Sequence, residues 1–205
     1  GESATIYEDP YEGVKTSTSG CLSSSASCMG FTVAYPVEGL NCDCSSDDKN
    51  HFITEIVGNT ATGGCKIGDK VSFYIQGQDT SRKIELGTVD LKQISPLKVS
   101  EQPVQISLLD IAQGMTGKVA TSMTMNDPTF KTMTGITRSF QAIGVAQNSN
   151  VAGDIQPIEL TVNLKNNLSK LDGNVTVADF LDGTYSTDIA PWLDLNPVSS
   201  TMAET

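Results

Sequence analysis

The fold of this chain is decided by residues 35–91, which read YPVEGLNCDCSSDDKNHFITEIVGNTATGGCKIGDKVSFYIQGQDTSRKIELGTVDL. Residues 71–75 are rich in the β-branched and aromatic side chains that favour strands. A second run of this kind covers residues 84–89, and the turn residues 77–80 lie between the two runs. This arrangement predicts an antiparallel hairpin with a long loop. Alternation along the second run predicts that its even-numbered residues share one face and its odd-numbered residues the other.

Further short strands are predicted before and within this stretch. They cover residues 5–7, 31–35 and 51–57. Short strands in succession must bury their apolar faces against another layer, so we predict a mainly β protein that begins with a disulfide-stapled, immunoglobulin-like β-sandwich over residues 1–98. The Cys…Trp…Cys signature of antibody domains is absent, because the one tryptophan of the chain is Trp192.

The chain changes character between Pro96 and Pro103, and we place a domain boundary there. A smaller mixed α+β domain is predicted over residues 99–205. Residues 104–112 are typical of a short strand or helix, and residues 158–162 alternate as a strand does.

The clearest helix signal lies near residues 128–143. Asp127 suits the N-cap, Pro128 suits the first helical position, and Gly144 is a stop signal. We expect the methionines in and around this helix to fill gaps in the core, with a promiscuous binding groove as the alternative. These methionines are Met115, Met123, Met125 and Met133.

Two features of the C-terminal segment also predict local structure. Residues 176–179 have the form of a capping box before a short helix that Gly183 ends. Trp192 is expected to anchor the end of the chain by burying its indole ring.

All five cysteines lie in the N-terminal part of the chain, at Cys21, Cys28, Cys42, Cys44 and Cys65. Such clustering predicts a local disulfide framework, as in exported proteins. We predict a bridge between Cys21 and Cys28, and a second from Cys65 to Cys42 or Cys44. Because spacing by two puts Cys42 and Cys44 on one strand face, only one of them is expected to meet Cys65 well. The odd count leaves one thiol, either free or paired with another chain.

Two metal hypotheses are weaker than the disulfide prediction. Cys42, Cys44 and Cys65 with His51 would supply four ligands, but C-x-C is not the usual zinc spacing. A calcium site lacks the D-x-D-x-D-G loop, so the acids involved are expected to be solvated loop residues. These acids are Asp43, Asp47, Asp48 and Asp90. We therefore predict neither a metal nor another cofactor.

The composition restricts the partners of the chain. It has 205 residues, a net charge of −11 and a pI near 4.4, so it has no electrostatic reason to bind nucleic acid or an anionic membrane. No apolar run is long enough to span a bilayer. The small, polar residues 1–5 resemble a mature N-terminus, and we expect an export segment, with a lipid-bearing cysteine, to have been removed upstream.

No catalytic motif is found. His51 is the only histidine, and it lies in a strand-like run without a Gly-x-Ser-x-Gly elbow. Phosphate loops and dinucleotide-binding fingerprints are also absent from the sequence. We therefore predict that the protein is not an enzyme.

Four segments resemble a recurrent β domain of bacterial exported lipoproteins and adhesin-like surface proteins. They are V-x-G-L-x-C-x-C at 37–44, GNTATGG at 58–64, KIGDKVSFYI at 66–75 and IELGTV at 84–89. Residues 65–67 depart from the family, which usually has an aromatic residue there, and Gln76 replaces a glycine. Residues 135–143 and 148–155 resemble the helix and tail of the family, although 144–147 replace its acidic loop. Within this group the chain is most similar to pilus-assembly proteins of the Fil type.

The resemblance implies a protein at the bacterial cell surface, or in the outer membrane or periplasm, that functions in pilus assembly or adhesion. Its partners would be other pilus or surface subunits, or a host ligand, contacted through strand edges and loops. The alternative is an exported ligand-binding domain, for example for glycans. A deep aromatic-lined pocket would favour glycan binding, whereas a flat exposed edge would favour assembly.

Overall fold

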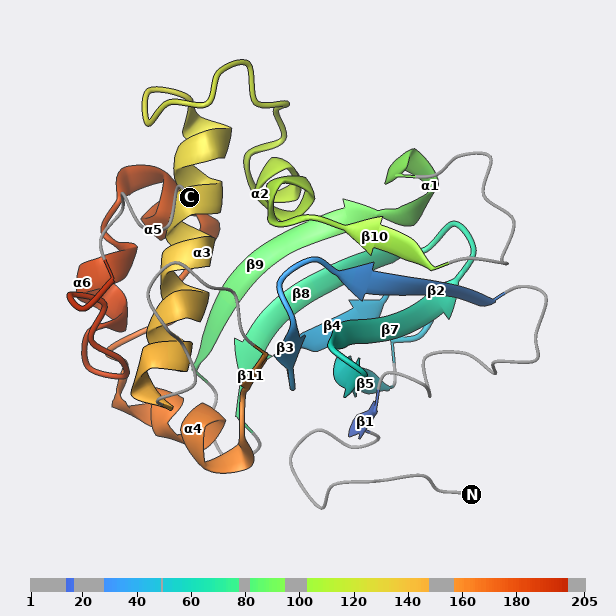
Figure 1. Cartoon of the computed structure of the whole chain (residues 1–205), viewed down its shortest axis with the longest axis horizontal. Helices are drawn as coiled ribbons and strands as arrows, with labels where there is room; N and C mark the ends of the chain where they lie inside the picture. Colours follow the sequence, from blue (N-terminus) through green and yellow to red (C-terminus); the bar gives the residue numbers. More distant parts are fainter. Residues whose placement is uncertain are drawn as a thin grey trace.

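The computed structural model describes residues 14–16, 28–48, 50–77, 82–94, 103–147 and 157–198, and for residues 14–16 the backbone alone. Two β-sheets form one side of the molecule, and the helices of the C-terminal half gather on the other side (Figure 1). The predicted strand at residues 5–7 lies outside the described residues, as does residue 98, where the predicted sandwich ends.

The first sheet has five strands in the order β1-β5-β4-β8-β9. Their bounds are β1 Val14–Thr16, β5 His51–Ile53, β4 Asn41–Cys44, β8 Lys70–Gln76 and β9 Lys83–Asp90. β1 runs parallel to β5, and the other neighbours are antiparallel. The predicted hairpin is confirmed as β8 and β9.

The predicted alternation along β9 holds only in its first half. The register shifts between Ser72 and Tyr74, as at a β-bulge. Ile84 and Leu86 are buried as expected, but Thr88 is exposed and Val89 is buried. After the bulge, the odd-numbered side chains of β9 face the core and the even-numbered ones face solvent. Alternation in the sequence alone does not reveal this change.

The second sheet has four strands in the order β10-β2-β7-β6. Their bounds are β10 Val104–Ile106, β2 Cys28–Val33, β7 Thr60–Lys66 and β6 Glu55–Val57. β10 is parallel to β2, so strands on both sides of the predicted domain boundary share this sheet. A small third sheet pairs β3 (Val37–Glu38) with β11 (Ile158–Glu159), also in parallel.

The run at residues 51–57, predicted as one strand, is divided between the two larger sheets at Thr54. The Thr54 side chain is buried, donates a hydrogen bond to the Val37 carbonyl at 2.6 Å and accepts one from the Leu40 amide at 3.0 Å. Its own amide donates to the Leu40 carbonyl at 2.8 Å. These bonds hold a corner at which the chain passes from β5 to β6.

Helices supply the rest of the regular structure. They are α1 Leu91–Ile94, α2 Leu108–Thr116, α3 Pro128–Ala146, α4 Val162–Asn166, the 3₁₀ helix η2 Asn167–Lys170, α5 Val177–Asp182 and α6 Tyr185–Ile189. Asp127 caps α3 as predicted, but the helix continues past Gly144 to Ala146. A helical glycine costs only about 1 kcal/mol, and Gly144 is not among the glycines with a positive φ that reverse the chain. Within the described ranges, no helix has both the length and the apolar character needed to cross a bilayer.

The predicted strand at residues 158–162 is shorter than expected. β11 ends at Glu159, and Thr161 caps α4 by accepting a hydrogen bond from the Leu164 amide at 3.1 Å. The capping box that begins α5 and the αL Gly183 that follows it are confirmed. Trp192 is buried as predicted, and its Nε1 donates to the Leu164 carbonyl at 2.7 Å.

Strands and helices share one hydrophobic core. Between the sheets, the rings of Phe31 in β2 and Phe73 in β8 pack edge to face, with their centroids 5.9 Å apart. The ring centroids of Tyr35 and of Phe140 in α3 lie 5.3 Å apart. Over the residues that the structure describes, the fold class is mixed α+β, with 35% helix and 31% strand. Within these residues β structure does not predominate as predicted, because the helices of the C-terminal half cover the sheets that the N-terminal strands form.

Candidate functional site

The cysteines of β4 face the interior, between the two larger sheets. Cys44 is bonded to Cys65 of β7, with a Cα–Cα distance of 5.6 Å, so the disulfide joins the five-stranded sheet to the four-stranded sheet. Of the two partners left open for Cys65, Cys44 is the one that pairs. Cys28 is also disulfide-bonded, and its predicted partner Cys21 lies outside the described residues.

Cys42 is the free thiol among the described cysteines, and it is buried. Burial raises the pKa of the Cys42 thiol well above its usual range, the charge of Asp43 raises it further, and Lys165 lowers it. The thiol is therefore neutral at physiological pH. Pairing of Cys42 with another chain would require the fold to open.

The hypothesis of a zinc site does not fit these positions. The bond between Cys44 and Cys65 removes two of the four proposed ligands as thiolates. A carboxylate oxygen of Asp69 lies within 4.8 Å of both sulfurs. Asp69 has a structural role, because it accepts hydrogen bonds from Ser46 Oγ at 2.8 Å and from the Lys66 amide at 3.1 Å.

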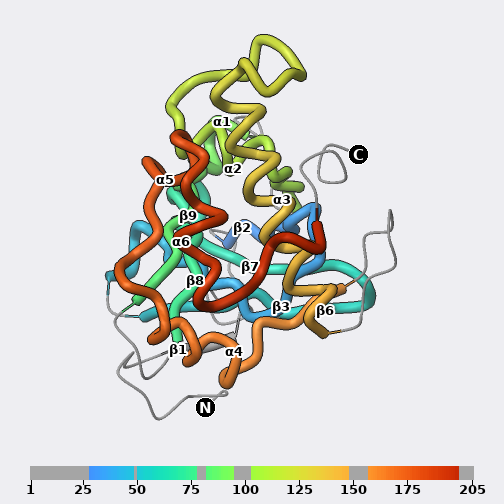
Figure 2. Tube along the Cα trace, turned by 90° about the vertical axis from the view of Figure 1, so that its left-hand side faces the viewer, coloured from blue at the N-terminus to red at the C-terminus, as the bar shows by residue number. Residues whose placement is uncertain are grey.

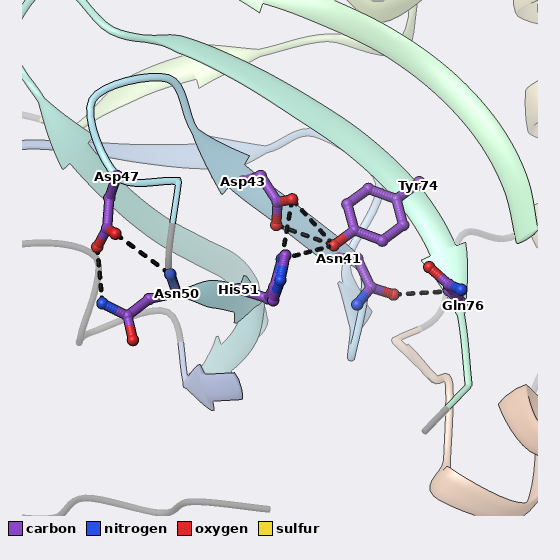
Figure 3. Close-up of polar contacts among 7 residues, drawn as sticks. All are labelled: Asn41, Asp43, Asp47, Asn50, His51, Tyr74 and Gln76. Carbon is purple, nitrogen blue, oxygen red and sulfur yellow. Dashed lines mark hydrogen bonds and ion pairs between the residues drawn. The ribbon is translucent and has the colours of Figure 1, made fainter. Parts of the chain in front are cut away.

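A polar cluster of Asp43, His51 and Tyr74 connects β4, β5 and β8 on the five-stranded sheet (Figure 3). The Tyr74 hydroxyl donates to the Asp43 carboxylate, at 2.9 Å from Oδ1 and 3.1 Å from Oδ2. His51 Nδ1 lies 3.1 Å from Asp43 Oδ2 and 3.4 Å from the Tyr74 oxygen. Asp43 was predicted to be a solvated loop acid, which is wrong: it lies in β4 and links three neighbouring strands.

We expect the substitution Tyr74→Phe to lower the free energy of unfolding by about 1 kcal/mol, the usual net value of one hydrogen bond. Urea denaturation measures it. Ser72→Ala is the matched control, because Ser72 lies in the same strand and its hydroxyl contacts only Thr88 Oγ1, at 3.0 Å on the exposed surface. An equal loss in the two variants would contradict a role for the Asp43–Tyr74 bond.

A buried lysine connects the C-terminal helices to the sheets. Lys165 of α4 donates to the Gly39 carbonyl at 2.8 Å and to Asn41 Oδ1 at 3.3 Å. Asn41 Oδ1 also accepts a hydrogen bond from the backbone amide of Gln76 at 3.0 Å, and this bond links β4 to the end of β8. A buried ammonium group is tolerated only where such acceptors surround it. Nothing in the sequence distinguished Lys165 from the other lysines.

Two of the surface cavities along the described residues are large enough to consider as binding sites. The larger, about 540 Å³, lies between β9, α1 and α2, and the smaller, about 430 Å³, lies beside β3, β6 and β11. Asp90 and Asp110 line the first, and Glu38 and Glu159 line the second. No aromatic side chain lines either cavity, so neither is the aromatic-lined pocket expected of the glycan-binding alternative.

At several strand edges, backbone groups that could pair with another strand are already hydrogen-bonded within the chain. The edge of β9 is paired at one end with the backbone of Val175, through the Glu85 amide at 2.8 Å. The outward amide of Ile56 in β6 donates to Glu38 Oε1 at 3.0 Å. On β11, the side-chain amide of Gln147 bonds to both the carbonyl and the amide of Glu159. Hydrogen bonds of this kind prevent uncontrolled pairing with other chains. Fewer backbone groups at these edges are therefore available for strand addition than expected.

The loop of residues 117–127, between α2 and α3, carries the two most exposed large apolar side chains of the described residues. Val119 is 66% exposed and Met123 65%, and Met125 of the same loop is 39% exposed. The core position expected for Met123 and Met125 is therefore wrong, whereas Met115 is buried and Met133 packs against the core. We name this segment the 117–127 loop.

Asp127 fixes the shape of the 117–127 loop. Its Oδ2 accepts hydrogen bonds from the Thr121 amide at 2.7 Å, the Thr121 hydroxyl at 3.0 Å and the Ser122 amide at 3.3 Å. Its Oδ1 caps α3 by accepting from the amides of Thr129 at 2.9 Å and Phe130 at 3.0 Å. One buried carboxylate thus orders both the loop and the start of the helix.

The hydrogen bonds to Asp127, from the Phe130 amide first and then the Thr121 amide, lower its pKa from 3.8 to about 2. Because the ionised Asp127 carboxylate is favoured in the folded state, it contributes to the free energy of unfolding at pH values above the unfolded-state pKa. This contribution is lost as the pH falls from about 4 towards 2 and the carboxylate becomes protonated. We expect Asp127→Asn to be less stable than the wild type at pH 6, and the difference to shrink by pH 2.5. Denaturant unfolding at both pH values measures it, and a difference independent of pH would contradict the role of the charge.

Comparison of the chain with protein families, with curated proteins and with solved structures finds no match.

Proposed function

We propose that this chain is a non-catalytic module of a protein exported to the bacterial cell surface, or to the outer membrane or periplasm, and that it acts in pilus assembly or adhesion through protein–protein contacts. The observation that carries the exported location is the Cys44–Cys65 bond between the two sheets, and the role in pilus assembly or adhesion follows from the sequence resemblance described above. Structural disulfides form in oxidising compartments outside the bacterial cytoplasm. The two fastened sheets would form the immunoglobulin-like sandwich that the sequence predicts, and the module would present its loops to partner subunits.

Three further observations support contact rather than catalysis. His51 is engaged with Asp43 and Tyr74 in a cross-strand cluster, which has an evident structural use. The two cavities lack aromatic side chains, which argues against the glycan-binding alternative. Exposed apolar side chains gather on the 117–127 loop, a feature typical of protein interaction sites.

Surface labelling tests this function. Cells that produce the full-length protein are treated with a membrane-impermeant, amine-reactive biotin reagent, and their surface fibres are then sheared off and collected by ultracentrifugation. We expect the protein to be labelled and to sediment with the sheared fibres. A protein that stays unlabelled and remains with the cytoplasm after osmotic shock has released the periplasmic contents would overturn the proposal, and a cytoplasmic enzyme of the same cells is the control for leakage.

A further inference from the structure

The 117–127 loop projects beyond the helices that flank it in both views of the molecule (Figures 1 and 2). Its exposed apolar side chains, Val119, Met123 and Met125, are called the apolar tip. Residues 119–126 read VATSMTMN and carry no charge, although the chain as a whole has a net charge of −11. The apolar tip therefore lies in an uncharged stretch of an acidic protein.

The apolar tip is presented on an ordered scaffold. Besides the bonds to Asp127, the Thr129 hydroxyl lies 2.6 Å from the Thr116 hydroxyl and donates to the Lys118 carbonyl at 2.8 Å. These contacts hold the two ends of the loop together. An ordered loop loses less conformational entropy on binding, and the methionine side chains at its end adapt to the shape of a partner.

We infer that the apolar tip docks into an apolar groove, edged by lysine or arginine side chains, on a different protein subunit. The inference rests on the proposed function and deepens it by naming the contact surface. Charge complementarity indicates the basic edge, because Val119 shares its cavity with the carboxylates of Asp90 and Asp110. Met123 and Met125 have apolar side chains, so we expect the surface of the partner that contacts them to be an apolar groove.

Two other occupants fit less well. On a second copy of this chain, the cavities open to the apolar tip are lined by acidic residues, either Asp90 with Asp110 or Glu38 with Glu159. Each copy also has a net charge of −11, so two copies repel each other. An anionic membrane would be repelled by the same charge. Lys118 is the one basic residue among residues 117–127, too few for a membrane-binding patch.

Photo-crosslinking in intact cells tests the inference. Met123 is replaced by p-benzoylphenylalanine in the full-length protein, in cells that carry their surface fibres. The matched control places the same probe at Val57 of β6, which is exposed to a similar extent, 58% against 65%. We expect an adduct with one other protein from position 123 and none from position 57. The crosslinked peptide of the partner should be apolar and flanked by lysine or arginine.

The charged double variant Val119→Asp, Met125→Asp, combined with the probe at 123, should reduce the yield of this adduct about tenfold. Because both side chains are exposed, its melting temperature should match that of the parent. An adduct with a second copy of the chain, an adduct with lipid, or equal yields at positions 123 and 57 would each overturn the inference. Surface labelling and fractionation of the same cells separate the two proposals: a labelled protein without the adduct refutes only the docking, whereas an unlabelled protein that remains with the cytoplasm refutes the function as well.

Discussion

The double variant Cys44→Ala, Cys65→Ala is expected to be about 3 kcal/mol less stable to unfolding than the wild type. The bridge closes a loop with a sequence separation of 21 residues, and in the chain-entropy model a loop of this size contributes about this much. It also joins strands of two different sheets, so its loss removes a covalent link between sheets that the hydrophobic core still holds together. Urea denaturation followed by circular dichroism measures the difference.

The single variant Cys42→Ala is the matched control for this prediction. Cys42 lies two residues from Cys44 on the same buried strand face, but it has no disulfide partner among the described cysteines. We expect it to lose about 1 kcal/mol, as a typical substitution does. Reduction of the wild type should cost at least as much stability as the double variant loses, because it also opens the disulfide of Cys28. Equal stabilities of the oxidised wild type and the double variant would show that the bond does not stabilise the fold.

The substitution Gly87→Ala is expected to lower the free energy of unfolding by about 2–3 kcal/mol. A Cβ atom at this position would lie 2.2 Å from the Ile111 carbonyl oxygen of α2, so the helix would have to move. Gly114 of α2 mirrors this arrangement, because its Cβ atom would lie 2.3 Å from the Thr88 carbonyl oxygen. β9 and α2 therefore meet backbone to backbone, which only glycine permits.

Gly173→Ala is the control for the same chemical change, since nothing lies within 4 Å of its Cβ position. We expect its stability to stay within about 0.5 kcal/mol of the wild type or to rise slightly, because alanine restricts the unfolded chain. The double variant Gly87→Ala, Gly114→Ala should lose less than the sum of the single variants, because one shift of α2 relieves both contacts. A neutral Gly87→Ala variant would contradict the close packing of α2 on β9.

The elements predicted correctly from the sequence have strong local signals. The hairpin of β8 and β9 combines strand-forming runs with turn residues, and α3 begins with the Asp127-Pro128 pair that favours a helix start. The capping box of α5 is also a local pattern. Such signals involve residues within a few positions of one another, so a single sequence reveals them.

The missed features depend on residues that are distant in the chain. The parallel pairing of β10 with β2 joins the two predicted domains, and no local pattern marks it. The corner at Thr54 depends on its bonds to Val37 and Leu40, and Lys165 is recognisable only once α4 lies against β4. Tertiary contacts of this kind override local preferences.

The 117–127 loop could have been found from the sequence. Gly117 ends α2 in the αL conformation and Asp127 starts α3, so the residues between them belong to neither helix. The prediction instead grouped Met123 and Met125 with the core because methionine commonly fills gaps there. Boundary signals on both sides of a segment are a better guide to exposure than the type of its side chains.

Peptide mapping of the native protein tests whether the Cys44–Cys65 disulfide fastens the two sheets. The protein is isolated from its cells in the presence of iodoacetamide and digested without reduction. We predict one linked peptide pair containing Cys44 and Cys65, with Cys42 alkylated only after denaturation. Alkylation of Cys44 and Cys65 in the native protein, or a link between Cys42 and Cys65, would contradict the account.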